Sequence, residues 1–208
     1  MVKRAFDVTV VLGAHLFPLL LPVWVLLWTV IPLLVWLEDR GPVFYLQRRV
    51  GKDGVQFTIR KFRTMTPDAE QRTGPVWATP GDARVTRIGR VLRATALDEL
   101  PQVMNVLKGE MSLVGPRAER PELHEQILND VPDFERRLQV RPGLTGLAQL
   151  SGGYDLSPAS KLRYDLEYIE RMSLWLDIKL ILRSVVRTAG ARWDQRSRQS
   201  DAPTPDRR

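Results

Sequence analysis

The longest uncharged stretch of the sequence constrains the fold more than any other feature. From Val8 to Leu37 the chain contains no Asp, Glu, Lys or Arg. Because a membrane-spanning helix needs roughly 20 apolar residues, this segment is long enough to enter a bilayer. Lys3 and Arg4 precede it and Glu38 follows it. Its length and the lack of a clear small-residue cleavage site do not fit a removable signal peptide.

Prolines interrupt this stretch and leave two arrangements open. An interior proline removes a backbone hydrogen bond and kinks a helix, so we expect a break near Pro18 and Pro22. The segment then either crosses the bilayer as one kinked helix or enters, turns and returns to the same face. Basic flanks prefer the cytoplasmic side, and only the returning arrangement keeps both Lys3 and the basic remainder of the chain there. The charge pattern therefore favours a re-entrant helix hairpin.

The composition narrows the chemistry of the remaining chain. Its 208 residues carry a net charge of +7, which suits phosphorylated substrates, anionic lipid or nucleic acid. Nucleic acid is not an expected partner, because the sequence has no recognition-helix, RNP-like or zinc-finger pattern. The absence of cysteine excludes disulfides and thiolate chemistry. The two histidines, His15 and His124, are too few and too far apart for a multi-histidine zinc site.

A basic β-hairpin is expected directly after the apolar stretch. Two runs with strand character, 43–46 and 55–62, flank a turn cluster at 51–54. Solvated strand faces explain part of its positive charge, but the density beside a membrane segment also suits lipid headgroups or a phosphate. The basic residues of this region are Arg48, Arg49, Lys52, Arg60, Lys61 and Arg63.

Two adjacent carboxylates, Asp98 and Glu99, are the first candidates for chemistry. Proline is tolerated in a first helical turn and glycine ends helices, so Pro101 predicts a helix over 98–109. Asp98 then lies at the helix N-terminus, where it can be an ordinary N-cap. The helix dipole there also favours an anion or a reactive carboxylate. The local sequence leaves both interpretations open.

Arginines lie on both sides of this carboxylate pair. Arg93 precedes it, and Arg117 follows a Gly-Pro turn. Acids with flanking arginines suit chemistry on a phosphate, because the acids can hold a metal or attack while the arginines hold the anion. Further on, the glycine-rich turn at 141–149 offers a backbone that can approach a ligand closely.

Helices are expected in the last third of the chain. Proline at a first helical position indicates one helix opening at Pro121, and Ser157 with the proline after it indicates another that reaches about Met172. The amphipathic run 173–187 is either a core helix or one that lies in the membrane interface. The polar tail 194–208 is expected to be disordered.

Four longer motifs occur in order along the chain. They are KFRTM at 61–65, LDELPQ at 97–102, NVLKGEMSLVGPR at 105–117 and RPGLTGLAQ at 141–149. Together they resemble the bacterial polyprenyl-phosphate sugar-1-phosphate transferases, also called monotopic phosphoglycosyl transferases. The resemblance runs from about Lys3 to Trp193. One departure is Ala118, where the family commonly has proline, and this loosens the expected turn.

The resemblance implies transfer of a sugar-1-phosphate from a UDP-sugar to a polyprenyl phosphate, typically undecaprenyl phosphate, with release of UMP. It implies that Asp98 attacks the β-phosphate to form a covalent aspartyl phosphosugar, and that Asp98 and Glu99 hold Mg²⁺. Lys61, Arg93 and Arg117 match the positions that grip the phosphates. The implied substrate-binding turns contain Pro116, Pro142, Gly143, Thr145, Gly146 and Gln149.

The expected fold is α+β, mainly α, in three parts. Residues 1–40 form a re-entrant membrane helix, broken at Pro18 and Pro22. Residues 41–193 form a cytoplasmic catalytic domain with a small basic β-hairpin and amphipathic interface helices, and 194–208 form a disordered tail. This places the protein at the bacterial inner membrane, in contact with lipid, with the catalytic domain on the cytoplasmic face. The sequence leaves the oligomeric state open, a homodimer included.

Two alternatives to covalent catalysis remain at this stage. One is direct, one-step phosphoglycosyl transfer with Asp98 only a metal ligand. The other is a non-catalytic basic protein that binds anionic lipid or a partner at the membrane surface. The sugar is also open, although the run 117–122 resembles relatives that start exopolysaccharide assembly, which leans toward a hexose such as glucose or galactose.

Overall fold

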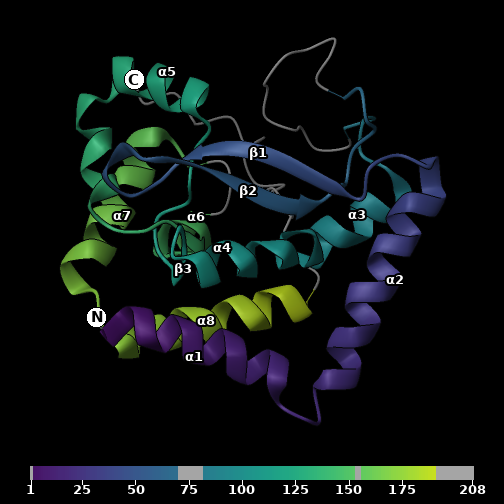
Figure 1. Ribbon diagram of the computed structural model, residues 1–208. Helices are drawn as coiled ribbons and strands as arrows, with labels where there is room; N and C mark the ends of the chain where they lie inside the picture. The colour runs from purple at the N-terminus through teal and green to yellow at the C-terminus, as the bar shows by residue number, and fades with distance from the viewer. Residues whose placement is uncertain (1, 70–81, 153–155, 191–208) are drawn as a thin grey trace, which may run out of the picture.

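The computed structural model describes residues 2–69, 82–152 and 156–190, and it is mostly helical with two small sheets (Figure 1). The α-helices are α1 (Val2–Leu16), α2 (Leu21–Asp39), α3 (Arg87–Ala94), α4 (Val103–Lys108), α5 (Pro121–Asp130), α6 (Leu147–Gly152), α7 (Pro158–Arg171) and α8 (Leu174–Ala189). The 3₁₀ segments are η1 (Lys52–Gly54), η2 (Leu97–Gln102) and η3 (Pro132–Gln139). The strands are β1 (Phe44–Val50), β2 (Gln56–Phe62), β3 (Ser112–Val114) and β4 (Gly143–Thr145). The predicted tail 194–208 lies outside the described residues.

The predicted break in the apolar stretch is the corner between α1 and α2 (Figure 1). Helix α1 ends just before Pro18, whereas Pro22 lies in the first turn of α2, where proline is tolerated. Because Pro18 has no N–H, it cannot donate to the carbonyl of Ala14. The indole Nε1 of Trp24 donates to that carbonyl instead, at 2.6 Å. A side chain of α2 thus satisfies the backbone group that the break leaves unpaired.

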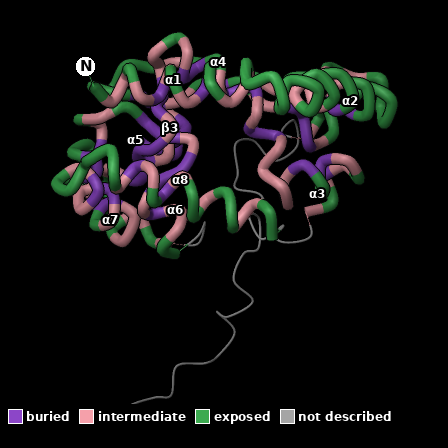
Figure 2. The backbone as a smooth tube through the Cα atoms, turned by 90° about the horizontal axis from the view of Figure 1, so that it is seen from below, coloured by how far each residue is buried: buried purple, intermediate pink, exposed green. Residues whose placement is uncertain are grey.

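Helix α2 is the one helix in the described part of the chain that is long and apolar enough to cross a membrane. Only Ile31 and Val35 on it are buried. Figure 2 shows α2 beside the rest of the molecule, exposed over most of its surface. A core helix of a water-soluble protein would be mostly buried, so this exposure agrees with a membrane-embedded segment.

Charged and polar contacts fix the start of α1 to the helical domain, which includes α4, α8 and β3. Lys3 forms an ion pair with Asp177 of α8, which is fully buried. Arg4 donates to the carbonyl of Leu107 at the end of α4, at 2.6 Å. Asp7, which is 2% exposed, accepts a 2.7 Å hydrogen bond from the hydroxyl of Ser112 in β3. The N-terminal end of the apolar stretch therefore packs against the domain that follows it.

The far end of α2 is fixed to the same domain. Asp39 forms an ion pair with Arg63, which follows β2. The carboxylate of Glu38 accepts hydrogen bonds from the backbone N–H groups of Arg87 and Ile88, which open α3. A carboxylate at a helix N-terminus satisfies free donors and the helix dipole. Both ends of the α1–α2 corner are therefore anchored on one body.

The basic hairpin is an antiparallel pair of β1 and β2, in register from Phe44 opposite Phe62 to Val50 opposite Gln56. Phe57, Ile59 and Lys61 share the less exposed face of β2, whereas Phe62 is buried on the opposite face at the end of the strand. Phe62 packs with residues of α2 and α3 in one core cluster. The strand that carries Lys61 is thereby held against α2 and α3.

The C-terminal helices lie where the sequence predicts them. Ser157 caps α7 by accepting from the N–H of Ser160, and α8 follows directly. Tyr168 of α7 and Leu180 of α8 are buried with β3, and α8 meets the start of α1 through the ion pair of Lys3 with Asp177. The outer face of α8 is apolar and exposed, with Trp175 76% and Val186 73% exposed. The helix is therefore part core helix and part exposed apolar surface.

Candidate active site

The carboxylate pair lies in η2, and here the structure corrects the predicted helix. The α-helix begins only at Val103, after the 3₁₀ turn Leu97–Gln102, and it ends as predicted at Gly109 with φ of 85°. The residue before η2 is Ala96 in the left-handed conformation, and no side chain caps the turn. Asp98 is therefore not an N-cap. Pro101 cannot donate a backbone hydrogen bond, which favours a short tight turn over an early start of the α-helix.

Glu99 is held by two cations. Its Oε1 accepts from Nζ of Lys61 on β2 at 2.7 Å and from a guanidinium nitrogen of Arg117 at 3.3 Å. The residue is 9% exposed. Burial alone would raise the pKa of Glu99, but the charges of Lys61 and Arg117 outweigh it and lower that pKa to about 2. Glu99 is thus permanently ionised and fixes two phosphate-binding candidates in place.

Asp98 is in a different state although it is the next residue. It is 8% exposed, and no hydrogen bond or ion pair holds its carboxylate within the described ranges. Burial raises the pKa of Asp98 to about 6, while the charges of Lys61 and Arg93 oppose that rise. Two neighbouring carboxylates with separated pKa values indicate separate roles. Asp98 is the free carboxylate, and Glu99 is the anchoring one.

Arg93 reaches this site from α3. Its Nε donates to the hydroxyl of Thr64, just after β2, at 3.0 Å. Its charge acts on Asp98. The structure therefore brings Lys61, Arg93 and Arg117 around the carboxylate pair, from β2, α3 and the segment after β3.

Hydrogen bonds to backbone carbonyls hold the segment after β3 that carries Arg117. The carbonyl of Arg117 accepts from Arg137 at 2.8 Å, and that of Ala118 accepts from Nη1 of Arg49 at 2.9 Å. The carbonyl of Glu119 accepts from the N–H of Val50 at 2.9 Å. Three successive carbonyls are thus fixed by other elements. This turn, expected to be loosened by Ala118, is stabilised by tertiary hydrogen bonds where a proline ring is missing.

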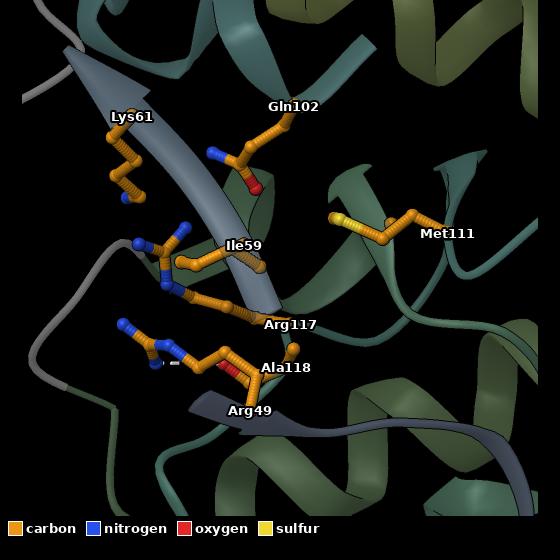
Figure 3. A pocket seen from close by; sticks show the side chains of 8 residues that line it. Arg49, Ile59, Lys61, Gln102, Met111, Arg117 and Ala118 are labelled. Carbon is orange, nitrogen blue, oxygen red and sulfur yellow. Dashed lines mark hydrogen bonds between the residues drawn. The ribbon is translucent and has the colours of Figure 1, made fainter. Parts of the chain in front are cut away.

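A pocket opens beside the carboxylate pair. Figure 3 shows the charged ends of Lys61, Arg117 and Arg49 gathered at one side, with the amide nitrogen of Gln102 directed toward them. The residues that line it are Arg49, Ile59, Lys61, Gln102, Met111, Arg117, Ala118 and Gly143. Asp98 and Glu99 do not belong to this lining, but Lys61 and Arg117 connect the pocket to Glu99. The pocket is therefore a cationic extension of the site.

The predicted glycine-rich turn has mainly a packing role in this structure. Strands β3 and β4 pair in parallel, with Ser112 opposite Gly143 and Val114 opposite Thr145. A Cβ atom on Gly143 would lie 2.1 Å from the backbone nitrogen of Gly115, so no side chain fits there. The expected close approach of this turn is thus to another backbone segment.

Of the predicted substrate-binding turn residues, Gly143 is the one found among the described residues that line the pocket. Pro116, Pro142 and Thr145 are buried. Gln149 donates to the carbonyl of Leu144 at 3.2 Å. Binding by these residues stays a prediction.

The side chains of the site fit a magnesium ion that protein and substrate hold together. They fit less well an ion that protein ligands alone enclose. No group of three or more His, Cys, Asp or Glu side chains is positioned to hold a metal in the described part of the chain. Mg²⁺ is commonly held by one or two carboxylates together with substrate phosphates. Asp98 and Glu99 supply that donor set, and the oxygens of Asp98 are not engaged by a neighbouring residue that the structure describes.

Sequence reasoning did not single out Gln102, Arg137 or the particular role of Arg49. Gln102 lies in the same 3₁₀ turn as the carboxylate pair, three residues after Glu99, so its position was a usable signal. Arg49 was one of several basic residues of the hairpin. Arg137 acts through a carbonyl distant in sequence, and no local pattern reports such a contact.

The chain is similar to known proteins over most of its length. Residues 1–190 match the family model described as bacterial sugar transferase. The chain is 43% identical over 193 residues, 88% of its length, to the UDP-glucose:undecaprenyl-phosphate glucose-1-phosphate transferase of Caulobacter vibrioides, and covers 68% of that protein. It is 42% identical over 189 residues, 88% of its length, to the UDP-N-acetylgalactosamine-undecaprenyl-phosphate N-acetylgalactosaminephosphotransferase of Aeromonas hydrophila.

A third relative is the UDP-galactose-lipid carrier transferase of Erwinia amylovora, 36% identical over 197 residues and 88% of this chain. The chain spans only 43% of the Aeromonas protein and 39% of the Erwinia protein. The three names carry three different sugars. The similarity therefore identifies the family and leaves the sugar undecided.

Proposed function

The chain belongs to the family of bacterial sugar transferases, and from this premise we propose that it transfers a sugar-1-phosphate from a UDP-sugar to a polyprenyl phosphate such as undecaprenyl phosphate. UMP is the second product of the transfer. The observation that carries the proposal is the unequal carboxylate pair, in which Glu99 is ion-paired and Asp98 is free. The reaction would start lipid-linked assembly of an exopolysaccharide or another glycoconjugate.

The unequal pair supports Asp98 as the nucleophile. An oxygen of Asp98 attacks the β-phosphorus of the UDP-sugar, the bond from that phosphorus to the UMP oxygen breaks, and UMP leaves with the bonding electrons. The phosphate of the polyprenyl acceptor then attacks the same phosphorus and releases the Asp98 carboxylate. Covalent catalysis replaces one difficult transfer with two easier ones. With a pKa of about 6, Asp98 is mostly ionised at neutral pH and ready to attack.

The cations hold the phosphates during both steps. Arg117 offers a planar fork that matches phosphate oxygens, and Lys61 adds a compact charge. Glu99 keeps both side chains in position, because it accepts from each of them. Arg93 lies near Asp98 and lowers the pKa that burial raises. Asp98 and Glu99 would hold Mg²⁺, which neutralises phosphate charge that otherwise repels an attacking carboxylate.

The membrane arrangement follows from the anchored ends of the α1–α2 corner. Lys3 at the start of α1 and Asp39 at the end of α2 both contact the helical domain. If the domain lies in the cytoplasm, both ends lie on the cytoplasmic face, and the corner enters the inner membrane and returns. Exposed Trp175 on α8 would lie in the interface. This arrangement brings a lipid-linked phosphate and a soluble nucleotide sugar to one site.

The test is a search for the covalent intermediate. Full-length protein in detergent receives Mg²⁺ and one UDP-sugar at a time, without acceptor, and intact mass reports any sugar-phosphate adduct. We expect an adduct and equimolar UMP with one sugar, absent in Asp98→Asn and retained in Asp130→Asn, which changes an exposed aspartate of α5.

Other outcomes separate the alternatives. Turnover with undecaprenyl phosphate but no adduct would indicate direct transfer with Asp98 as a metal ligand. No reaction with any UDP-sugar, with or without acceptor, would favour a non-catalytic lipid-binding protein. The sugar that forms the adduct identifies the donor, which we expect to be a hexose derivative.

A further inference from the structure

Two hydrogen-bond donors of the pocket have no partner among the described residues. Gln102 is only 4% exposed, and its Nε2 atom is buried without a hydrogen bond. The Nε atom of Arg49 is also buried and unpaired. The other two nitrogens of that guanidinium donate to Ala118 and Gln47. Buried donors without partners are rare, because each has given up its hydrogen bonds to water. Two in one pocket indicate a site for an acceptor.

The charge of the pocket shows what kind of acceptor fits. Arg49 and Arg117 end side by side, near Lys61 (Figure 3). Burial and then the charge of Arg117 lower the pKa of Arg49 to about 10, as expected for two neighbouring cations, although the charge of Glu119 opposes this. Glu99 forms ion pairs with Lys61 and Arg117 but not with Arg49. An anion with several oxygens would relieve this repulsion and accept from the unpaired donors.

The pocket adjoins the surroundings of Asp98, because Lys61 and Arg117 line it and also act on the Asp98 carboxylate. Arg93 is among the charges that act on Asp98, and Asp98 does not line the pocket. Arg117 acts on both Asp98 and Arg49. The charged end of Arg117 lies between Gln102 on one side and Arg49 on the other, beside Lys61 (Figure 3). A phosphate in the pocket would share Lys61 and Arg117 with a phosphate next to Asp98, which suits two phosphate groups that meet in one reaction.

We propose that Arg49 and Gln102 form a second phosphate subsite, beside the phosphate that Asp98 attacks. The inference rests on the proposed function and deepens it. Nε2 of Gln102 and Nε of Arg49 donate to oxygens of a phosphate that forms no bond to Asp98. That phosphate belongs either to the departing UMP or to the lipid acceptor, which present the same anionic oxygens. Gln102 and Arg49 form no covalent bond, so the chemistry of the two transfer steps is unchanged.

The two half-reactions distinguish the two sources of phosphate. Single-turnover adduct formation from the UDP-sugar without acceptor reports the first half, and discharge of the isolated adduct by undecaprenyl phosphate reports the second. We expect Gln102→Met to slow at least one of them by about 10- to 100-fold, the effect of losing a hydrogen bond to a charged group. Slower formation assigns the subsite to the UMP phosphate, and slower discharge assigns it to the acceptor phosphate.

UMP binding provides a readout that needs no turnover. Isothermal titration of wild type with UMP, compared with Gln102→Met, should show the same loss of affinity if the subsite holds the nucleotide phosphate. Gln139→Met is the matched control, because Gln139 is exposed and donates only to a nearby carbonyl in η3. The control should match wild type in both half-reactions. If Gln102→Met also matches wild type in both, the inference is wrong.

A third substitution tests which atom of the amide faces the ligand. Gln102→Glu places a negative charge where the phosphate would bind, so we expect a larger loss than in Gln102→Met. Equal or higher activity in Gln102→Glu would mean that the amide oxygen faces the cations, which would overturn the subsite. Arg49→Lys, which keeps the charge but not Nε, should slow the same half-reaction as Gln102→Met. A wild-type protein with neither adduct nor turnover would contradict the proposed function itself.

Discussion

Two buried groups of charges in this protein have opposite character. Arg137 and Asp165 form an ion pair at 2.7 Å with each side chain 2% exposed, and Arg137 also donates to a backbone carbonyl. Around the carboxylate pair, in contrast, Asp98 has no partner that the structure describes and Gln102 retains an unpaired donor. The first group is satisfied within the protein, as structural charges must be. The second is satisfied only in part, as expected of groups that bind a substrate.

The largest expected effect separates the two members of the carboxylate pair. Asp98→Asn should lower turnover by at least about 10³-fold, because the nucleophile is lost. It should not lower the free energy of unfolding, since it removes a carboxylate whose pKa is raised by burial. Steady-state UMP release measures the loss of turnover, and denaturant unfolding measures the free energy of unfolding. Loss of both activity and stability would place Asp98 with the structural charges.

Breaking the satisfied ion pair should act on stability. Asp165→Leu leaves the Arg137 charge buried and unpaired, and should lower the free energy of unfolding by about 3–5 kcal/mol. The double variant Arg137→Met with Asp165→Leu should recover most of this loss, because neither charge then remains buried. Denaturant unfolding in detergent gives both values. A single variant as stable as wild type would show that this pair is less enclosed than its exposure indicates.

The pH dependence should report Asp98 alone. Burial raises the pKa of Asp98 to about 6, whereas Glu99, with a pKa of about 2, stays ionised. Below about pH 6 the Asp98 carboxyl is protonated and cannot attack, so the rate of adduct formation should fall by about tenfold per pH unit. Above about pH 7 it should level off.

Neighbouring charges should move this midpoint in opposite directions. Arg93 lowers the pKa of Asp98 and Glu99 raises it. Arg93→Met should therefore shift the midpoint of the single-turnover profile to higher pH, and Glu99→Gln should shift it to lower pH. A midpoint that neither substitution moves would belong to another group.

A smaller effect on kcat/KM is expected when the planar guanidinium of Arg117 is replaced by an ammonium group. Arg117→Lys keeps the charge but loses the planar fork, and should reduce kcat/KM by about tenfold. The backbone at this position is held through its carbonyl by Arg137, so the fold should be unaffected. Arg136→Lys, at an exposed position of η3, is the matched control. Equal kcat/KM for Arg117→Lys and wild type would show that only charge matters there.

The smallest effect tests the corner of the membrane segment. Trp24→Phe keeps an aromatic ring but removes the N–H that pairs with the carbonyl of Ala14, and should cost about 1 kcal/mol. The midpoint of thermal unfolding in detergent should fall, whereas Trp175→Phe on the exposed face of α8 should leave it unchanged. An unchanged midpoint for Trp24→Phe would mean that the corner does not depend on this bond.

Local sequence patterns were sufficient to predict secondary structure where a residue type allows few backbone conformations. Proline has no N–H and favours a helix break or a helix start, so the break near Pro18 could be predicted, as could the starts of α5 and α7 at Pro121 and Pro158, although Pro32 lies inside α2. Two runs with strand character on both sides of a glycine-containing turn likewise indicated the hairpin of β1 and β2. Each of these features depends on residues that are neighbours in sequence.

The roles within the site could not be assigned from local patterns. Asp98 and Glu99 are adjacent and chemically alike, so no spacing shows which one is free. Their difference comes from Lys61 on β2 and Arg117 after β3. Both donate a hydrogen bond to Glu99 and not to Asp98. The role of the glycine-rich turn could likewise not be assigned from the local sequence. Its glycines could face a ligand or another strand, and only the parallel pairing of β3 with β4 decides between them.

The sequence by itself therefore determined the apolar segment, its break, the hairpin and the set of residues from which the site is built. It also carried the family resemblance, because long ordered motifs survive in the chain. Tertiary structure alone decided that Asp98 has no partner among the described residues, that Glu99 is ion-paired and that Gln102 faces the cations of the pocket. The physical reason is that burial and the charges of distant elements set pKa values and leave donors unpaired, and both depend on contacts between residues far apart in the chain.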